Sequence, residues 1–390
     1  MGIKKLFTFL NNNSMYKVYP YINDLISELK LKKTNTIIGV DGNLFCYKYA
    51  HSYDNMLIGF FNQIIQFLSN SLLPLYIFDG GTIQEKENTN HNRSQKKQFN
   101  KVKLEQIEEH PDEYAESDSE YAVLKKKYEK NTIRIKTDEI NILLEMFDLL
   151  NIPYIFSYGE GEYLAVMLNQ YGIIDMFLTD DTDPIPAGII KTIKFYNNGV
   201  YYLNTEETLK KLSINKSEFI DFCILLGSDY SLFHHGYKPN ELFELIKTHK
   251  CIENIITEKI ENKQLVNIEL INKIRKIYRE SGENERMFFT NPNAHKSNYN
   301  FIIDHSNYNF YSNIMLEFWD EFLEIINKDL KDITKGMAEL FKNSINNYVR
   351  QKKFNIKNIV KFLKNNIPDI SDKEISNAQI TFEYLNSFGF

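Results

Sequence analysis

Short apolar runs that each end at an acidic residue constrain this chain more than any other feature. Four runs rich in β-branched and aromatic residues have the length and composition of buried strands: 36–40, 75–78, 154–156 and 173–178. Amphipathic helical patterns separate these runs, over 55–69, 138–150 and 162–170. This alternation predicts an α/β fold in which helices flank a twisted parallel sheet.

The composition is that of a folded, water-exposed chain. With 390 residues, of which 43% are hydrophobic, it can bury one large core or two ordinary ones. Cys46, Cys223 and Cys251 lie far apart, which argues against a disulfide framework and a structural zinc site. No apolar stretch approaches the roughly 18 residues of a membrane helix. We therefore expect an intracellular protein that does not contact membranes.

An acidic residue lies at or just beyond the end of every predicted strand. In chain order these residues are Asp41, Asp79, Glu160, Glu162, Asp181 and Asp183. Because the carboxyl ends of parallel strands share one edge of a sheet, we expect the carboxylates to converge there. Each acid alone is better explained as a turn former or a helix N-cap. Their combination at one edge favours a shared ligand.

A cation is the ligand that such a cluster needs, because crowded carboxylates otherwise repel one another. Oxygen donors without histidine or cysteine select Mg²⁺, for which Mn²⁺ can substitute. So many carboxylates exceed the requirement of one Mg²⁺, and we predict two ions. A pair of metal ions roughly 4 Å apart can hydrolyse a phosphodiester.

Charge is segregated along the chain although the net charge is only −6. Residues 86–103 carry six Lys or Arg and one Glu, and residues 342–364 carry seven Lys or Arg and no acid. Both segments are candidate phosphate-binding surfaces. The segment 84–134 is charged and poor in large aliphatic residues, which predicts either disorder or helices that form over a ligand.

Several motifs in order resemble the flap endonucleases, structure-specific 5′ nucleases of the broader XPG type, over residues 1–256. These motifs are MGIKKL, IGVDGNLFCYKY, PLYIFDGG, the segment around GEGEY, LTDDTDPIPAG and FIDFCILLGSDY. The resemblance implies a PIN-like sheet, an arch over 84–134 and a diverged helix-hairpin-helix unit over 216–256. It leaves 257–390 as a mostly helical C-terminal region. It also implies that Asp229, in LGSDY, joins the second metal site as a seventh carboxylate.

The resemblance implies roles for four further residues. Lys86 and Arg93 stand where the family has a catalytic arch lysine and arginine that steady the scissile phosphate. Tyr47 matches a tyrosine that stacks on a base, and Gly2 matches a free N-terminus beside the active site. Without the resemblance, Tyr47 is interpreted as a core residue. The other basic residues of this segment are interpreted as solvated: Lys96, Lys97, Lys101 and Lys103.

Departures from the family pattern affect the loops and the predicted duplex contacts. Gly159 and Gly161 flank Glu160 where the family has alanine, and His234-His235-Gly236 replaces a Gly-x-Gly hairpin that binds duplex phosphates. The helical pattern IKNIVKFLK places three lysines on one face, either against duplex DNA or in solvent: Lys357, Lys361 and Lys364. The C-terminus lacks the spacing of a sliding-clamp peptide, so we expect no clamp interaction, and we expect a monomer.

The predicted function is a Mg²⁺-dependent 5′ endonuclease that cleaves flaps or branched DNA in replication, repair or recombination. A 5′ to 3′ exonuclease or a junction resolvase of the same superfamily is the alternative enzyme. The alternative from another class is a non-catalytic DNA-binding or scaffold relative, which retention of all seven carboxylates disfavours. The composition, rich in Asn, Ile, Lys and Tyr, fits an AT-rich eukaryote or a large DNA virus such as a poxvirus. The predicted location is accordingly the nucleus or a cytoplasmic replication site.

Overall fold

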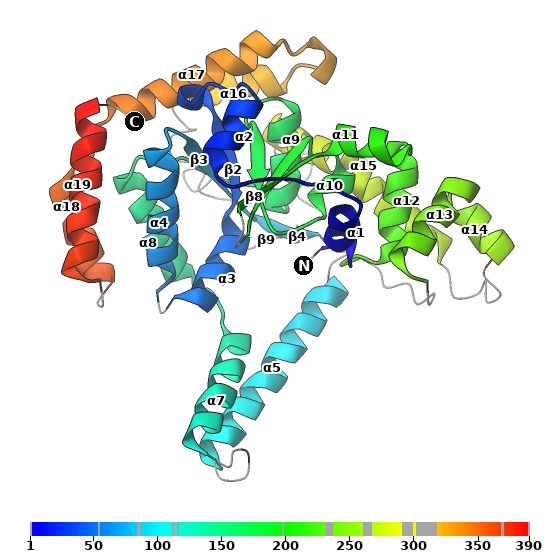
Figure 1. The fold of residues 1–390 in the computed structure, drawn as a ribbon, viewed down its shortest axis with the longest axis horizontal. Coiled ribbons are helices and arrows are strands. Elements are labelled where there is room, and N and C mark those ends of the chain that lie inside the picture. Colours follow the sequence, from blue (N-terminus) through cyan, green and yellow to red (C-terminus); the bar gives the residue numbers. More distant parts are fainter. Residues whose placement is uncertain are drawn as a thin grey trace.

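A seven-stranded mixed sheet forms the centre of the molecule (Figure 1). The computed structural model describes residues 2–53, 55–83, 87–110, 114, 117–196, 199–230, 237–259, 267–290, 299–301, 318–367 and 370–388. The strand order is β1-β8-β7-β6-β2-β3-β5. The strands are β1 (Lys17–Tyr19), β2 (Ile37–Asp41), β3 (Leu73–Phe78), β5 (Tyr154–Phe156), β6 (Met176–Leu178), β7 (Lys191–Tyr196) and β8 (Gly199–Asn204). A separate pair joins β4 (Gly81–Ile83) to β9 (Tyr299–Phe301).

The sheet is parallel from β7 to β5 and antiparallel at its other margin. β2 pairs in parallel with both β3 and β6, β3 pairs with β5, and β6 pairs with β7. β8 runs antiparallel to β7 and to β1. The predicted α/β fold and its four strands are therefore confirmed. The sequence patterns missed the antiparallel margin, whose strands are only partly buried.

Helices cover both faces of the sheet (Figure 1). α9 lies against β2, β3 and β6, and α3 and α4 lie against β3. The helices up to residue 259, the arch aside, are α1 (Leu6–Asn12), α2 (Ile22–Glu28), α3 (Gly42–Ser52), α4 (Met56–Ser69), α8 (Thr137–Leu149), α9 (Gly161–Gln170), α10 (Pro184–Ala187), α11 (Thr205–Leu212), α12 (Lys216–Leu226), α13 (Pro239–His249) and α14 (Ile252–Lys259), with the 3₁₀ turn η1 (Lys33–Asn35). The helices predicted over 55–69, 138–150 and 162–170 are thus α4, α8 and α9.

The charged insertion forms a helical arch that projects from the body (Figure 1). α5 (Glu87–Glu109) and α7 (Asp118–Thr132) pack side by side, and an ion pair of 2.8 Å joins Lys125 to Glu108 between them. Of the two possibilities for 84–134, helices rather than disorder describe 87–109 and 118–132. The low content of large aliphatic residues suits a helix pair that buries little apolar surface.

The C-terminal helices pack onto the body rather than apart from it. They are α15 (Ile268–Thr290), α16 (Trp319–Ile326), α17 (Lys335–Gln351), α18 (Ile356–Asn366) and α19 (Asp372–Phe388), with the 3₁₀ turn η6 (Leu330–Asp332). α18 contacts α8, α19 contacts α4, and α17 contacts η1. The boundary near residue 256 remains a prediction. Within the described part of the chain, no helix combines the length and apolar character that crossing a membrane requires.

A buried ion pair fastens α17 to the sheet. Lys342 Nζ lies 2.8 Å from Asp175 Oδ1, and both side chains are almost fully buried. The other oxygen, Asp175 Oδ2, accepts a hydrogen bond from Ile37 N at the start of β2. Removal of one partner from such a pair leaves an uncompensated buried charge, which destabilises the folded protein more than burial of the complete pair does.

We expect Lys342→Met to lower the free energy of unfolding by about 3 kcal/mol, because Asp175 then stays buried without its cation. Urea denaturation followed by circular dichroism measures this change. The control is Lys331→Met, at a lysine whose side chain is 77% exposed, and this variant should unfold as the wild type does. The double variant Lys342→Met/Asp175→Asn should recover part of the loss, and strict additivity of the two changes would show that the pair is not coupled.

Candidate active site

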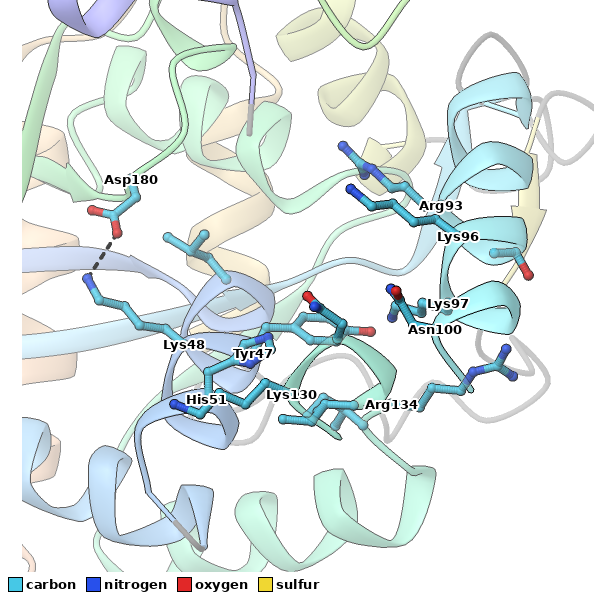
Figure 2. A pocket seen from close by; sticks show the side chains of 15 residues that line it. Tyr47, Lys48, His51, Arg93, Lys96, Lys97, Asn100, Lys130, Arg134 and Asp180 are labelled. Atoms are coloured by element: carbon cyan, nitrogen blue, oxygen red, sulfur yellow. Dashed lines mark hydrogen bonds and ion pairs between the residues drawn. The ribbon is translucent and has the colours of Figure 1, made fainter. Parts of the chain in front are cut away.

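A basic cavity of about 820 Å³ opens where the arch meets the body (Figure 2). α3 contributes one wall, α5 a second, and the segment from the end of α7 to Ile135 a third. Its lining has six cationic side chains, Lys48, Arg93, Lys96, Lys97, Lys130 and Arg134, and one carboxylate, Asp180. Asp180 is itself paired with Lys48 at 2.9 Å and with Lys194 at 3.7 Å. The cavity therefore has a strong excess of positive charge.

Tyr47 lies within this cavity on α3, with Lys97 Nζ 4.9 Å from the centre of its ring. Burial, Arg134 and Arg93 together lower the pKa of Lys97, and burial and the nearby Lys130 and Lys97 lower the pKa of His51. The cations are close enough to repel one another, so a bound anion would be stabilised by several of them. Lys97, which the sequence placed in a solvated segment, is instead half-buried.

The predicted strand-end acids meet at one edge of the sheet. β2, β3, β5 and β6 are adjacent and parallel, so their carboxyl ends point the same way. The chain leaves β2 towards β3 on one side and returns as β6 on the other, which opens a crevice at this edge. Asp180 lies outside the group, and its carboxylate pairs with Lys48 and Lys194.

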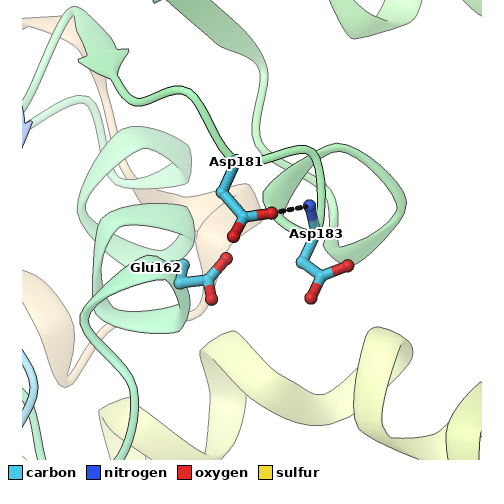
Figure 3. Close-up of side chains that lie close together, drawn as sticks. All are labelled: Glu162, Asp181 and Asp183. Atoms are coloured by element: carbon cyan, nitrogen blue, oxygen red, sulfur yellow. Dashed lines mark hydrogen bonds between the residues drawn. The ribbon is translucent and has the colours of Figure 1, made fainter. Parts of the chain in front are cut away.

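Three of these acids lie close enough to share a cation (Figure 3). Glu162, in the first turn of α9, and Asp181 and Asp183, beyond β6, each place a carboxylate oxygen within 4.8 Å of the other two. Asp181 Oδ1 accepts hydrogen bonds from Thr182 N at 2.6 Å and Asp183 N at 3.2 Å, which fixes the loop. Asp183 is fully buried.

Asp41 and Asp79 stand beside this group at the ends of β2 and β3. Burial and the Asp79 carboxylate raise the pKa of Asp41 to about 7, and Asp181 adds to this shift. Hydrogen bonds from Leu44 N at 2.9 Å and Thr179 Oγ1 at 2.8 Å oppose it. A raised pKa of this origin is what a site crowded with carboxylates shows when their charge is not neutralised.

Glu160 caps the start of α9 and is buried. The next residue, Gly161, donates its N–H to Asp79 Oδ1 at 2.6 Å, and a Cβ there would lie 3.2 Å from the same oxygen. The departure from the family pattern at Gly161 therefore has a structural use, because it lets Asp79 approach the helix start closely.

Asp229 and Arg93 form an ion pair of 2.5 Å between the body and the arch. Asp229 follows α12, and Arg93 lies in α5. The structure thus brings Asp229 and the arch arginine together, while the place of Asp229 in a second metal site remains a prediction. Lys86 and the segment His234-His235-Gly236 lie outside the described residues.

Gly2 lies close to Asp181. Its backbone has φ +78°, and a Cβ atom at this position would lie 1.9 Å from Asp181 Oδ1. The neighbouring Ile3 N donates to Thr182 Oγ1 at 2.9 Å. By contrast, Lys357, Lys361 and Lys364 lie exposed on α18, which packs on α8 and α19. Their contact with duplex DNA remains a prediction.

Three residues that touch the acids or their loops were not among the predicted site residues. Thr179 Oγ1 donates to Asp41 and accepts from Asp181 N at 3.0 Å. Tyr278 and Glu285, both in α15, reach the loops from more than 90 residues away in the chain. Only Thr179, which lies within the acidic motif LTDD, had a local signal in the sequence.

Two family models match this chain, one on each side of the arch. The XPG N-terminal domain matches residues 1–100, and the XPG I-region matches residues 151–229. Together these segments contain all seven predicted carboxylates. The chain belongs to the XPG family. Its similarity to this family supports a structure-specific 5′ nuclease, which is a hydrolase, and dependence on divalent metal is typical of the family.

Relatives of this XPG-family chain occur in eukaryotes and in a virus. It is 26% identical to a flap endonuclease 1 of Enterocytozoon bieneusi, over 66% of this chain and 72% of the relative. It is also 26% identical to a probable RAD2-like endonuclease, 369L, of Invertebrate iridescent virus 6, over 65% of this chain and 73% of the relative. For a flap endonuclease 1 of Plasmodium chabaudi chabaudi the identity is 27%, over 68% of this chain and 59% of the relative.

Solved structures share the fold of this XPG-family chain. The catalytic core of Rad2 in complex with a DNA substrate superposes with a TM-score of 0.56 at 16% identity, over 98% of this chain and 100% of that one. Flap endonuclease-1 from Methanococcus jannaschii superposes with a TM-score of 0.55 at 16% identity, over 95% of this chain and 96% of that one. The PIN-like fold is therefore confirmed.

The donor set fits a hard divalent cation. The clustered ligand atoms of Glu162, Asp181 and Asp183 are carboxylate oxygens only. Such donors suit Mg²⁺ or Mn²⁺ rather than zinc or copper, which take nitrogen and sulfur ligands. The raised pKa of Asp41 agrees, because a neighbouring cation would restore its ionised form.

Gly2→Val should lower the cleavage rate of this XPG-family chain by about 100-fold, because the added side chain displaces Asp181 by more than 1 Å. Single-turnover cleavage of a labelled 5′ flap measures the change. Lys4→Ala, which alters an exposed side chain two residues away, is the control and should cleave at the wild-type rate. A Gly2→Val enzyme as fast as the control would mean that Gly2 does not pack against Asp181 in the active enzyme.

Proposed function

We propose that this chain is a Mg²⁺-dependent endonuclease that cuts branched DNA beside a single-stranded 5′ arm. One observation carries the proposal: a cluster of carboxylates and a basic cavity adjoin each other, and the Arg93–Asp229 ion pair spans the boundary. A nuclease that uses metal ions needs both parts, because the metal ligands must be anionic and the strand path must be cationic.

The seven acids would hold two Mg²⁺ ions, for which Mn²⁺ can substitute. The clustered Glu162, Asp181 and Asp183 would supply one group of ligands. Asp41, Asp79, Glu160 and Asp229 complete the predicted set. Divalent ions bound there would supply Lewis-acid activation of water and neutralise charge on the phosphodiester.

Arg93 would supply the chain's own contribution to the reacting phosphate. Its guanidinium now donates to Asp229 Oδ2, at the junction of arch and acids. A guanidinium binds a phosphate in the same forked geometry as a carboxylate, so Arg93 can exchange one anion for the other. Lys86 remains a predicted second cation at this position.

The basic cavity would hold the single-stranded 5′ arm. Six cations line it, and they can contact successive phosphates without reading sequence. The half-buried ring of Tyr47 offers a face on which a base can stack, which is equally independent of sequence. The substrate is thus recognised by its shape and by its single strand.

Asp181→Ala should reduce cleavage of a labelled 5′ flap by about 1000-fold or more, because it removes a ligand shared by the cluster, while DNA binding persists. Gel-based cleavage and fluorescence anisotropy measure the two properties. Asp320→Ala, an exposed carboxylate on α16, is the matched control and should keep full activity. EDTA should abolish wild-type cleavage, and Mg²⁺ or Mn²⁺ should restore it. Undiminished cleavage by Asp181→Ala, or in EDTA, would refute the proposed metal site.

Lys97→Ala/Arg134→Ala should weaken binding of a single-stranded oligonucleotide and lower the slope of log affinity against log salt by about 1.4, since each phosphate contact contributes about 0.7. Titrations at several KCl concentrations measure the slope. Lys211→Ala, an exposed lysine on α11, is the control. An unchanged slope in the double variant would place the strand outside this cavity.

The triple alanine variant of Lys357, Lys361 and Lys364 should weaken the binding only of substrates with a long duplex arm.

A further inference from the structure

Helix α15 reaches the acidic site from outside the two segments that match the family models. It spans residues 268–290 and packs against α9 and α10, the helices that carry or follow the clustered acids. Two polar side chains on its inner face are almost completely buried: Tyr278 at 0% and Glu285 at 1% exposure. They stand seven residues apart, which places them on the same face of the helix.

Glu285 holds the loop that leads into α9. Its Oε1 accepts a hydrogen bond from Gly159 N at 2.9 Å, and its Oε2 accepts one from Tyr158 N, also at 2.9 Å. Both donors are backbone groups immediately before Glu160, so the carboxylate of Glu285 sets the position from which Glu160 and α9 begin.

The same loop is tied to the end of β3. Gly80 N donates to Gly159 O at 3.0 Å and to Ser157 Oγ at 3.2 Å. A Cβ on Gly80 would lie 1.9 Å from Ser157 O, so the two segments touch through their backbones. Since Asp79 precedes Gly80, a shift of the loop held by Glu285 would move Asp79 as well as Glu160.

Tyr278 holds the other half of the site. Its hydroxyl donates to Asp183 Oδ1 at 3.4 Å. Its ring meets the ring of Tyr230 edge-on, with centres 5.9 Å apart, and the Tyr230 hydroxyl is hydrogen-bonded to that of Tyr163 in α9. Tyr278 therefore links Asp183, beyond β6, to the helix that carries Glu162.

Small residues between Tyr278 and Glu285 allow α15 to approach α9 closely. A Cβ on Gly282 would lie 3.5 Å from Val166 Cγ1 and 3.6 Å from Met167 N, and Ser281 is buried beside it. At this separation the side chain of Glu285 can reach the loop that leads into α9. Burial of a carboxylate is costly, and Glu285 is compensated by two backbone N–H groups.

We infer that Glu285 and Tyr278 are positioning residues of the acidic site, which together hold Glu160, Asp79 and Asp183 in the arrangement that binds a divalent cation. The inference rests on the proposed function, because it concerns the same site. Neither residue needs to touch the cation. Each acts through a hydrogen bond to a ligand carboxylate or to the backbone beside one, and loss of such outer partners typically weakens metal binding by 10- to 100-fold.

The test is a titration of the full chain with Mn²⁺ in the absence of DNA. The electron paramagnetic resonance signal of free Mn²⁺ measures how much of the metal is bound. Glu285→Gln and Tyr278→Phe should each raise the dissociation constant by about tenfold. Glu283→Gln, at an exposed glutamate of the same helix that pairs with Arg286, is the matched control and should bind Mn²⁺ as the wild type does. Tyr278→Phe keeps the buried ring, so it decides the question if Glu285→Gln does not fold.

Cleavage gives a second readout. The Mg²⁺ concentration for half-maximal flap cleavage should rise about tenfold in both variants, with a smaller change in the rate at saturating Mg²⁺. If both variants bind Mn²⁺ with wild-type affinity and only their thermal unfolding midpoints fall, the two residues are structural and the inference is overturned. If the wild type itself binds no Mn²⁺, the proposed metal site fails, which is a different result.

Discussion

The mutual repulsion of carboxylates at one edge of the sheet is the interaction on which the rest of the structure depends. Four adjacent parallel strands deliver these acids to the same place, where burial and Asp79 raise the pKa of Asp41 to about 7. Backbone N–H groups of Leu44 and Gly161 and the hydroxyl of Thr179 partly offset the repulsion. A divalent cation at this edge would complete the compensation, so the arrangement of the strands accounts for the need for a cation.

The arch supplies the opposite charge. The acids alone would repel a phosphodiester, but the cavity beside them carries six cations that attract it. Lys97 and His51, whose pKa values are lowered by burial and by their cationic neighbours, show how closely these groups are placed. The cations of the cavity would thus bind a nucleic acid strand and place it beside the acids, which would hold the divalent cation.

The sequence predicted the centre of this arrangement better than its surroundings. Strands β2 and β5 were evident because buried parallel strands are nearly continuous apolar runs, and Asp41 and Asp181 followed from strand ends. β7 and β8 were missed because partly buried strands mix polar and apolar residues. Asp229 could be predicted only from the resemblance to a family, because it follows a helix and the other acids were recognised at the ends of strands. Glu285 lies inside a long helix, and its contact with Gly159 spans 126 residues, so no local pattern could reveal it.

The ion pair between Arg93 and Asp229 has a further consequence for how the enzyme would work. Side-chain exposures of 43% and 18% make it a weak bond, of the kind typically worth no more than about 1 kcal/mol. Thermal energy or competing ions can break an ion pair this weak, so separating Arg93 from Asp229 needs neither nucleotide hydrolysis nor a partner protein. Ionic strength should therefore change the rate at which the strand enters the cavity, separately from its effect on the affinity for DNA.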